Sequence, residues 1–130
     1  MRRTLVCAAV AASAVAAPVA AHHSFAAFYH EDQRVTIEGD LVEFQYRNPH
    51  AWVHVMVTEP DGTRQQYSAE WGGPGRLRRQ GVQADTLQPG DHLIISGAPG
   101  RNPEERRIHL REITRPADGW AYAGRGRDRR

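Results

Sequence analysis

This 130-residue chain contains no lysine and only one cysteine. Its single cysteine, Cys7, lies in an apolar run near the start, so the rest of the chain can form no disulfide and has no thiol chemistry. Any metal bound after that run must use histidine, methionine, carboxylate or backbone ligands. Every basic side chain is arginine, and we attach no function to that usage.

The sequence also lacks an apolar run long enough to span a membrane. Residues 5–17 form an apolar stretch of about 13 residues, whereas a spanning helix needs roughly 20, and Pro18 breaks any helix there. Because two arginines precede the stretch and small residues follow it, residues 1–21 are predicted to be a cleavable signal peptide. We expect cleavage after Ala21, with Ala20 as the alternative site. The mature protein would be periplasmic and would not span the membrane, whereas an uncleaved anchor helix is the other interpretation.

An excess of positive charge is missing from the mature chain. Removing residues 1–21 takes away two of the 17 basic residues and leaves as many arginines as the 15 acidic residues. A neutral mature domain has no strong field for a polyanion, so we expect no nucleic-acid partner.

Catalytic motifs are absent as well. The serines lack a nucleophile elbow, and the glycines of residues 72–75 are not followed by the lysine of a phosphate-binding loop. Glu70 and His50 are the residues on which an enzyme hypothesis would rest, because a buried carboxyl group can serve as a general acid. We rank that hypothesis last and predict a non-enzymatic protein.

The mature chain alternates apolar and polar residues in short runs bounded by turn residues, a pattern typical of β-strands. The predicted elements are strands at 34–46, 51–58, 63–71, 92–98 and 107–114, and a helix at 74–80. The apolar phase changes beyond Leu41, and with Gly39 nearby this predicts a bulge or a sharp bend in the first strand.

Three strands, one short helix and two strands are the order of a five-stranded OB-like β-barrel, with a small mixed sandwich as the alternative. We therefore predict a mainly β fold with four parts. The signal peptide is followed by a His/aromatic lead-in at 22–33, the β-domain at 34–115, and a disordered Gly/Arg-rich tail at 116–130.

Histidines at the predicted mature start are candidate copper ligands. After cleavage at Ala21, the amine and ring of His22 would chelate Cu(II), which favours tetragonal nitrogen coordination, and one further imidazole would complete the site. After cleavage at Ala20, His23 would be the third residue and would bind with the amine and two backbone amides. A solvated pair of histidines without metal is the alternative.

The strand at 51–58 supplies the other candidate ligands. His54 and Met56 share one face and lie roughly 7 Å apart, but His50 is roughly 13 Å from His54, too far to share an ion with it. His50 and His54 are therefore alternative partners for the amino terminus. Packing of this face under the aromatic lead-in is the competing interpretation.

A ligand-binding or partner-binding surface is predicted from aromatic and turn residues. Its members are Phe25, Phe28, Asn48, Pro49 and Trp52. His92 and His109 are expected to be ordinary surface residues.

Two short motifs support a family resemblance. The runs HHSFA at 22–26 and NPHAW at 48–52, together with Glu70 and the LQPGD turn at 87–91, resemble an uncharacterised family of short exported bacterial proteins. The resemblance covers about residues 22–119 and carries a domain-of-unknown-function label, so it implies no activity.

The resemblance also implies that the family's pattern uses His22, His23 and the Asn48-to-Trp52 run. The chain departs from that pattern at His30, where relatives tend to have Asp, and at Tyr46, where they tend to have Trp. The hypothesis that follows is a small exported binding module, with copper as the candidate ligand. The alternative is an accessory subunit that docks on a larger envelope enzyme or transporter.

Overall fold

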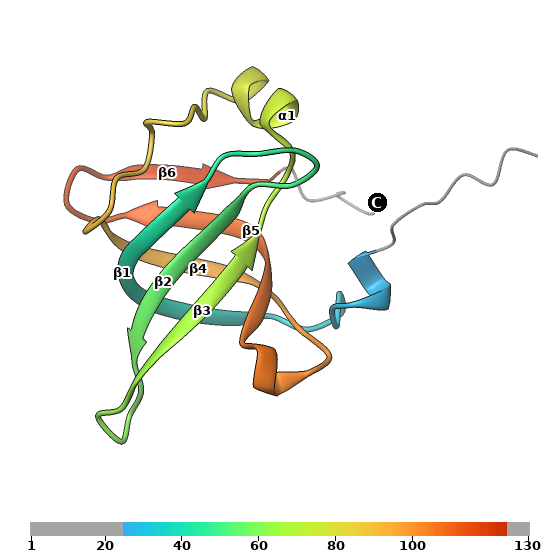
Figure 1. The fold of residues 1–130 in the computed structure, drawn as a ribbon, viewed down its shortest axis with the longest axis vertical. Coiled ribbons are helices and arrows are strands. Elements are labelled where there is room, and N and C mark those ends of the chain that lie inside the picture. The colour runs from blue at the N-terminus through green and yellow to red at the C-terminus, as the bar shows by residue number, and fades with distance from the viewer. Residues whose placement is uncertain (1–24, 125–130) are drawn as a thin grey trace, which may run out of the picture.

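The computed structural model describes residues 25–124. The predicted signal peptide, His22 and His23 at the predicted mature start, and residues 125–130 of the tail lie outside the described residues. Six strands make one sheet, with the helix between the third and the fourth (Figure 1). The elements are β1 (Val35–Gln45), β2 (Trp52–Thr58), β3 (Arg64–Glu70), α1 (Pro74–Arg79), β4 (His92–Pro99), β5 (Arg107–Arg115) and β6 (Trp120–Ala123).

Five of the strands close into a barrel. The sheet runs β3-β2-β1-β4-β5-β6, and a parallel pairing of β3 with β5 joins the first strand of that series to the fifth. This closure and the helix between β3 and β4 are the arrangement of an OB-type barrel. The predicted fold class is therefore confirmed. The alternative, a sandwich of two separate sheets, is wrong because the pairing of β3 with β5 closes a single sheet into a barrel.

The predicted irregularity of the first strand is also confirmed. The register between β1 and β2 shifts between Leu41 and Glu43. Gly39 lies just before this bulge, where a Cβ would be 2.4 Å from the carbonyl oxygen of Met56. Only glycine lets the two backbones approach so closely, so β1 can bend and pair with β2 on one side and β4 on the other.

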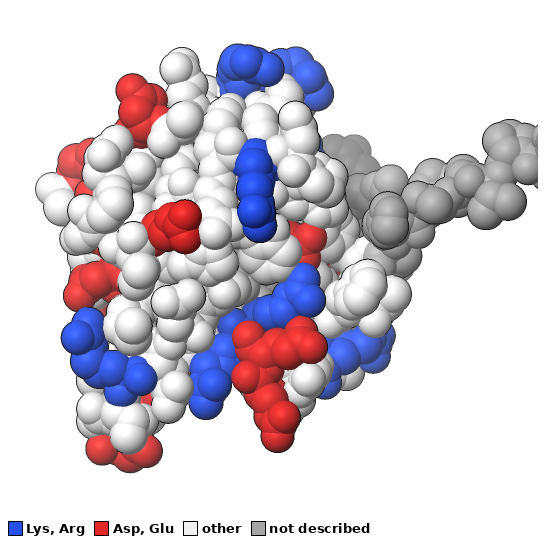
Figure 2. All heavy atoms as spheres, viewed as in Figure 1, with Lys and Arg blue, Asp and Glu red and all other residues white. Residues whose placement is uncertain are grey.

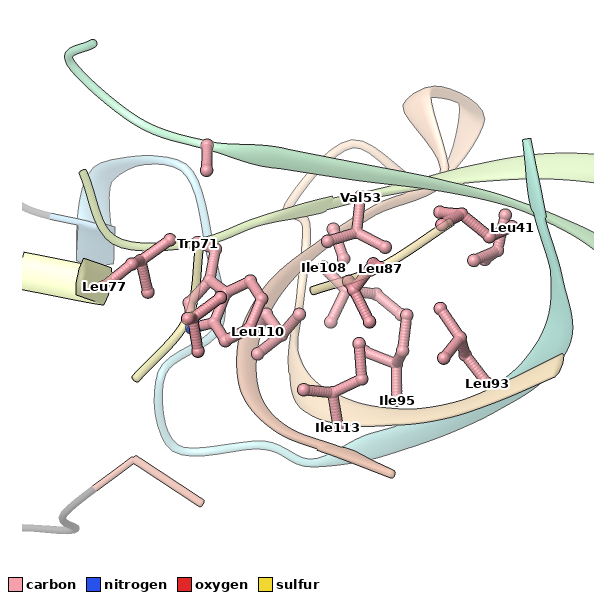
Figure 3. Packing of buried hydrophobic residues seen from close by; sticks show 14 of the residues in the cluster. Leu41, Val53, Trp71, Leu77, Leu87, Leu93, Ile95, Ile108, Leu110 and Ile113 are labelled. Atoms are coloured by element: carbon pink, nitrogen blue, oxygen red, sulfur yellow. The ribbon is translucent and has the colours of Figure 1, made fainter. Parts of the chain in front are cut away.

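The alternating apolar residues of the strands fill the barrel. Val53 and Val55 on β2 are fully buried, as are Leu93 and Ile95 on β4. Their side chains point into one interior together with those of β1 and β5 (Figure 3). Leu77 of α1 is fully buried at one end of this core, so the short helix covers the end of the barrel.

The end of the domain differs from the expectation. The chain was predicted to lose regular structure after Arg115, but residues 120–123 form β6, which pairs with β5. A turn with Gly119 at φ 73° reverses the chain, and the short strand offered too little alternation to be recognised. No helix of the described residues is long and apolar enough to cross a membrane.

Candidate functional site

The lead-in is bound to the barrel through its backbone and through one buried aromatic ring. A 3₁₀ turn, Phe25–Ala27, is followed by Tyr29, which is completely buried and forms a β-bridge with Gly100. The amide of His30 donates to the carbonyl of Pro99 at 2.9 Å. The start of the described chain is thereby fixed beside the end of β4.

A buried carboxylate holds this arrangement together. Glu70, at the end of β3, is 8% exposed and accepts three donors. Tyr29 donates its hydroxyl at 2.5 Å, His50 donates Nδ1–H at 2.6 Å, and Arg107 on β5 donates at 3.2 Å. Burial first, and then the hydrogen bond to Glu70, raise the pKa of Tyr29. One carboxylate therefore joins four segments of the chain at the same end of the barrel.

The contact with Glu70 fixes the orientation of His50. A carboxylate accepts and cannot donate, so in the neutral imidazole the proton sits on Nδ1 and the lone pair on Nε2. Nε2 makes no hydrogen bond to any other described residue, and the side chain is 29% exposed. A histidine whose Nδ1–H is held by a carboxylate is the usual arrangement of a metal ligand with its outer partner.

A second histidine has the same kind of partner. His109 on β5 contacts Glu31 of the lead-in through Nδ1 at 2.7 Å, and Arg111 binds the same carboxylate at 2.9 Å. Burial raises the pKa of Glu31, but the hydrogen bonds from His109 and Arg111 outweigh it, so the pKa lies below its usual value. The expectation that His109 is an ordinary surface residue is therefore wrong.

Phe25 packs against both of these histidines. Its ring stacks on His109 with centroids 3.7 Å apart and on His50 with centroids 5.2 Å apart. Phe25 therefore places the first described residues of the chain directly beside His50. His22 precedes Phe25 by three residues, and three residues of extended chain reach at most about 10 Å.

The remaining predicted residues of β2 lie farther along the outer face. Trp52 packs on the guanidinium of Arg107, with 4.9 Å from its carbon to the ring centroid. His54 stacks parallel to Trp52 at 6.3 Å, and its Nδ1 lies 2.8 Å from the hydroxyl of Ser68. Burial lowers the pKa of His54. Phe25 of the lead-in packs on His50 and His109. Trp52, which was predicted to pack under the lead-in, packs on Arg107.

The predicted turn residues connect His50 to the rest of the domain. Asn48 and Pro49 are exposed and joined by a cis peptide bond. A Cβ on Gly73 would lie 2.6 Å from the carbonyl oxygen of Pro49, so the loop before His50 packs tightly on the start of α1. Phe28 of the lead-in is likewise exposed, at 56%.

The described residues do not make a complete metal site by themselves. Within residues 25–124, no group of three or more histidine, cysteine or acidic side chains could hold a metal ion. Any site built on His50 therefore needs ligands from another part of the chain. A surface hollow of about 470 Å³ lies elsewhere, at the tip of the β2–β3 hairpin. Its lining includes Glu59, Asp61, Tyr67 and Arg106. It includes neither Glu70 nor any of the three residues that donate to Glu70.

Sequence reasoning missed Tyr29, Glu31 and Arg107, which supply most of the contacts at this end of the barrel. The available signal was an aromatic residue and an acidic residue just before a strand, together with an arginine at the start of another strand. Such residues are common on surfaces, and only the parallel pairing of β3 with β5 brings Arg107 to Glu70.

Comparison with known proteins gives a family match and a set of structural similarities. The profile of a family of unknown function, DUF6152, matches residues 7–109. No curated protein matches the chain. Two crystal structures of the mitochondrial single-stranded DNA-binding protein Rim1 from S. cerevisiae are similar at 11% identity, with TM-scores of 0.47 and 0.42. Both matches cover 71% of this chain, and they cover 95% and 96% of the Rim1 chains.

Proposed function

This chain belongs to the DUF6152 family of unknown function, and we propose that it is an exported, non-enzymatic binding protein of the cell envelope that binds copper through its mature amino terminus. The first 21 residues would direct export and be removed. The amine and ring of His22 would supply two nitrogen ligands, and Nε2 of His50 would supply the third.

The orientation of His50 is the observation that supports this proposal most directly. Glu70 holds Nδ1 at 2.6 Å, which leaves Nε2 as the atom with a lone pair. Phe25 packs against the same ring, within about 10 Å of chain from His22. His54 is a poorer third ligand than His50, because it lies four residues farther along the chain and its Nδ1 contacts Ser68.

Copper titration of the exported protein tests the proposal. The protein would be produced with its own leader, its mature start confirmed by intact mass, and Cu(II) added while electron paramagnetic resonance is recorded. We expect one tight equivalent with a nitrogen-rich tetragonal signal. Blocking the terminal amine should abolish that signal, and His50→Ala should weaken binding, while the matched control His54→Ala should not.

Other outcomes point to other sites. A tight signal that requires His23 but not His50 would indicate cleavage after Ala20, with His23 and two backbone amides as ligands. Loss of the signal in His54→Ala alone would move the site to His54 and Met56. Absence of tight binding with the native start would refute the copper proposal.

A partner-docking role is the second candidate, and the exposure of Phe28 favours it. A large aromatic side chain that is 56% exposed on a firmly held segment is the kind of residue that anchors protein interfaces. In this case the protein would be an accessory subunit of a larger envelope protein. Native purification should then yield that protein in fixed stoichiometry, and Phe28→Ser should release it without changing the stability of the domain.

A further inference from the structure

One end of the barrel carries arginines without acidic neighbours in the sequence. Arg76, Arg78 and Arg79 on α1 are all exposed, and residues 71–84 contain no aspartate or glutamate. Figure 2 shows the resulting positive group over α1 at the top of the view. The arginine salt bridges of the described residues belong to Arg34, Arg107, Arg111 and Arg115. The charges of α1 are thus directed at solvent.

The rest of the domain has the opposite charge. Residues 25–124 hold eleven arginines against fourteen acidic residues, and three of those eleven are on α1. Outside α1 the described domain is therefore clearly negative, although the mature chain as a whole is neutral. Such a separation of charge orients a protein near a charged surface even when its net charge is zero.

The chain leaves the described domain beside the same helix. Tyr122 on β6 packs edge-on against Trp71, with centroids 4.8 Å apart, and its hydroxyl donates to the side chain of Gln80 at 2.9 Å. Residues 125–130, which follow directly, add four arginines and one aspartate to the sequence. The basic end is defined as the three arginines of α1.

We propose that the basic end binds the surface of a lipid bilayer that contains anionic phospholipids. Arginine pairs well with phosphate, and basic residues near an anionic bilayer each contribute to reversible surface attachment. The aromatic residues at this end are not available as stacking platforms for nucleic acid bases. Trp71 is 2% exposed, and the hydroxyl of Tyr46 donates to the backbone of Pro74 and Val82. A basic surface whose neighbouring rings, those of Trp71, Tyr46 and Tyr122, are buried or hydrogen-bonded within the domain fits a diffuse layer of headgroups better than a single strand.

The test is co-sedimentation of the mature, full-length protein with vesicles. Vesicles of phosphatidylcholine alone would be compared with vesicles that also contain phosphatidylglycerol. We expect binding to the anionic vesicles only, and its loss in high salt, because such attraction falls off within a Debye length. Neutralising each arginine near an anionic surface should reduce partitioning about fivefold, so the triple change of Arg76, Arg78 and Arg79 to Gln should reduce it roughly 100-fold.

A matched control variant tests whether binding depends on the position of the removed charges or only on the net charge of the protein. The triple variant Arg34→Gln, Arg64→Gln, Arg106→Gln removes the same charge from other parts of the barrel and should retain binding. Circular dichroism would confirm that each variant is folded.

Three results would overturn the proposal. The first is equal binding to neutral and anionic vesicles. The second is an equal loss of binding in the control and the α1 variant. The third is tighter binding to a single-stranded oligonucleotide than to the anionic vesicles, which would assign the basic end to nucleic acid. Copper binding is not involved in any of them, so the two proposals fail independently.

Discussion

Replacing Tyr29 with Phe removes one hydroxyl from a fully buried site and leaves the ring in place. The hydroxyl donates to Glu70 at 2.5 Å, and Glu70 is itself 8% exposed. Hydrogen bonds to charged groups contribute about 1.5–3 kcal/mol to stability. Because His50 and Arg107 still satisfy the carboxylate in the variant, we expect a loss of about 2 kcal/mol in the free energy of unfolding.

Urea unfolding of the mature protein measures this loss in free energy. In thermal unfolding, the melting temperature of the variant should be lower by about 8–15 °C. Tyr67→Phe is the matched control, since its hydroxyl donates to Glu59 at 2.7 Å in a more exposed setting and should cost less than about 1 kcal/mol. Hydrogen exchange at the amide of His30 should also accelerate in Tyr29→Phe, because that amide is bonded to Pro99 in the segment that Tyr29 anchors. A Tyr29→Phe variant as stable as Tyr67→Phe would refute the anchoring role of Glu70.

Three further predictions concern pH and backbone packing. Hydrogen bonds to Glu38 and Asp40 raise the pKa of His92 above its ordinary 6.5, so the small stabilisation from this exposed ring is present below that pH and is lost as pH rises through the raised value. Comparing unfolding of the native protein with His92→Gln across that range checks the sign, and an advantage that grows toward alkaline pH would contradict it. Glu31 behaves in the opposite way, because its lowered pKa gives stability that is present above its ordinary 4.5 and is lost as pH falls; the gap between the native protein and Glu31→Gln should close in acid. Finally, Gly97→Ala should destabilise by about 3 kcal/mol or more, since its Cβ would lie 2.0 Å from the carbonyl oxygen of His109. Gly75→Ala in α1, whose Cβ would only approach Arg79 at 3.9 Å, should be neutral or slightly stabilising, and equal stabilities of the two variants would contradict the close approach.

Most of the fold was predicted from the alternation of apolar and polar residues along the strands. The inward residues of β2 were recognisable because Val53, Val55 and Val57 recur at every second position, and the glycine-proline turns marked the ends of the strands. β6 was missed because four residues after a turn give too little pattern. The pairing of β3 with β5 could be expected only from the order of elements, since nothing in the local sequence of either strand specifies a parallel partner.

The candidate site was harder to predict because its contacts join residues far apart in the sequence. His50 was singled out from its motif and was named with Glu70 only in the enzyme hypothesis, but no contact between these two residues, twenty positions apart, was predicted. Tyr29 and His109 are each ordinary residues of their segments. They gain their roles only when the lead-in lies across the ends of β3 and β5, which places Phe25 on His109 and Tyr29 on Glu70.

The pairing of β3 with β5 also determines how the domain can meet other copies of itself. Open sheet edges offer unpaired amides and carbonyls to strands of other molecules, which is a common route to aggregation. In the barrel each of β1 to β5 has a partner on both sides, and among the described residues only β6, four residues long, pairs on one side alone. Among the described residues, the open edges are thereby reduced to β6 and to residues 64–67 of β3, which lie beyond the three residue pairs that join β3 to β5. This limits edge-to-edge association in a domain whose described residues include no cysteine.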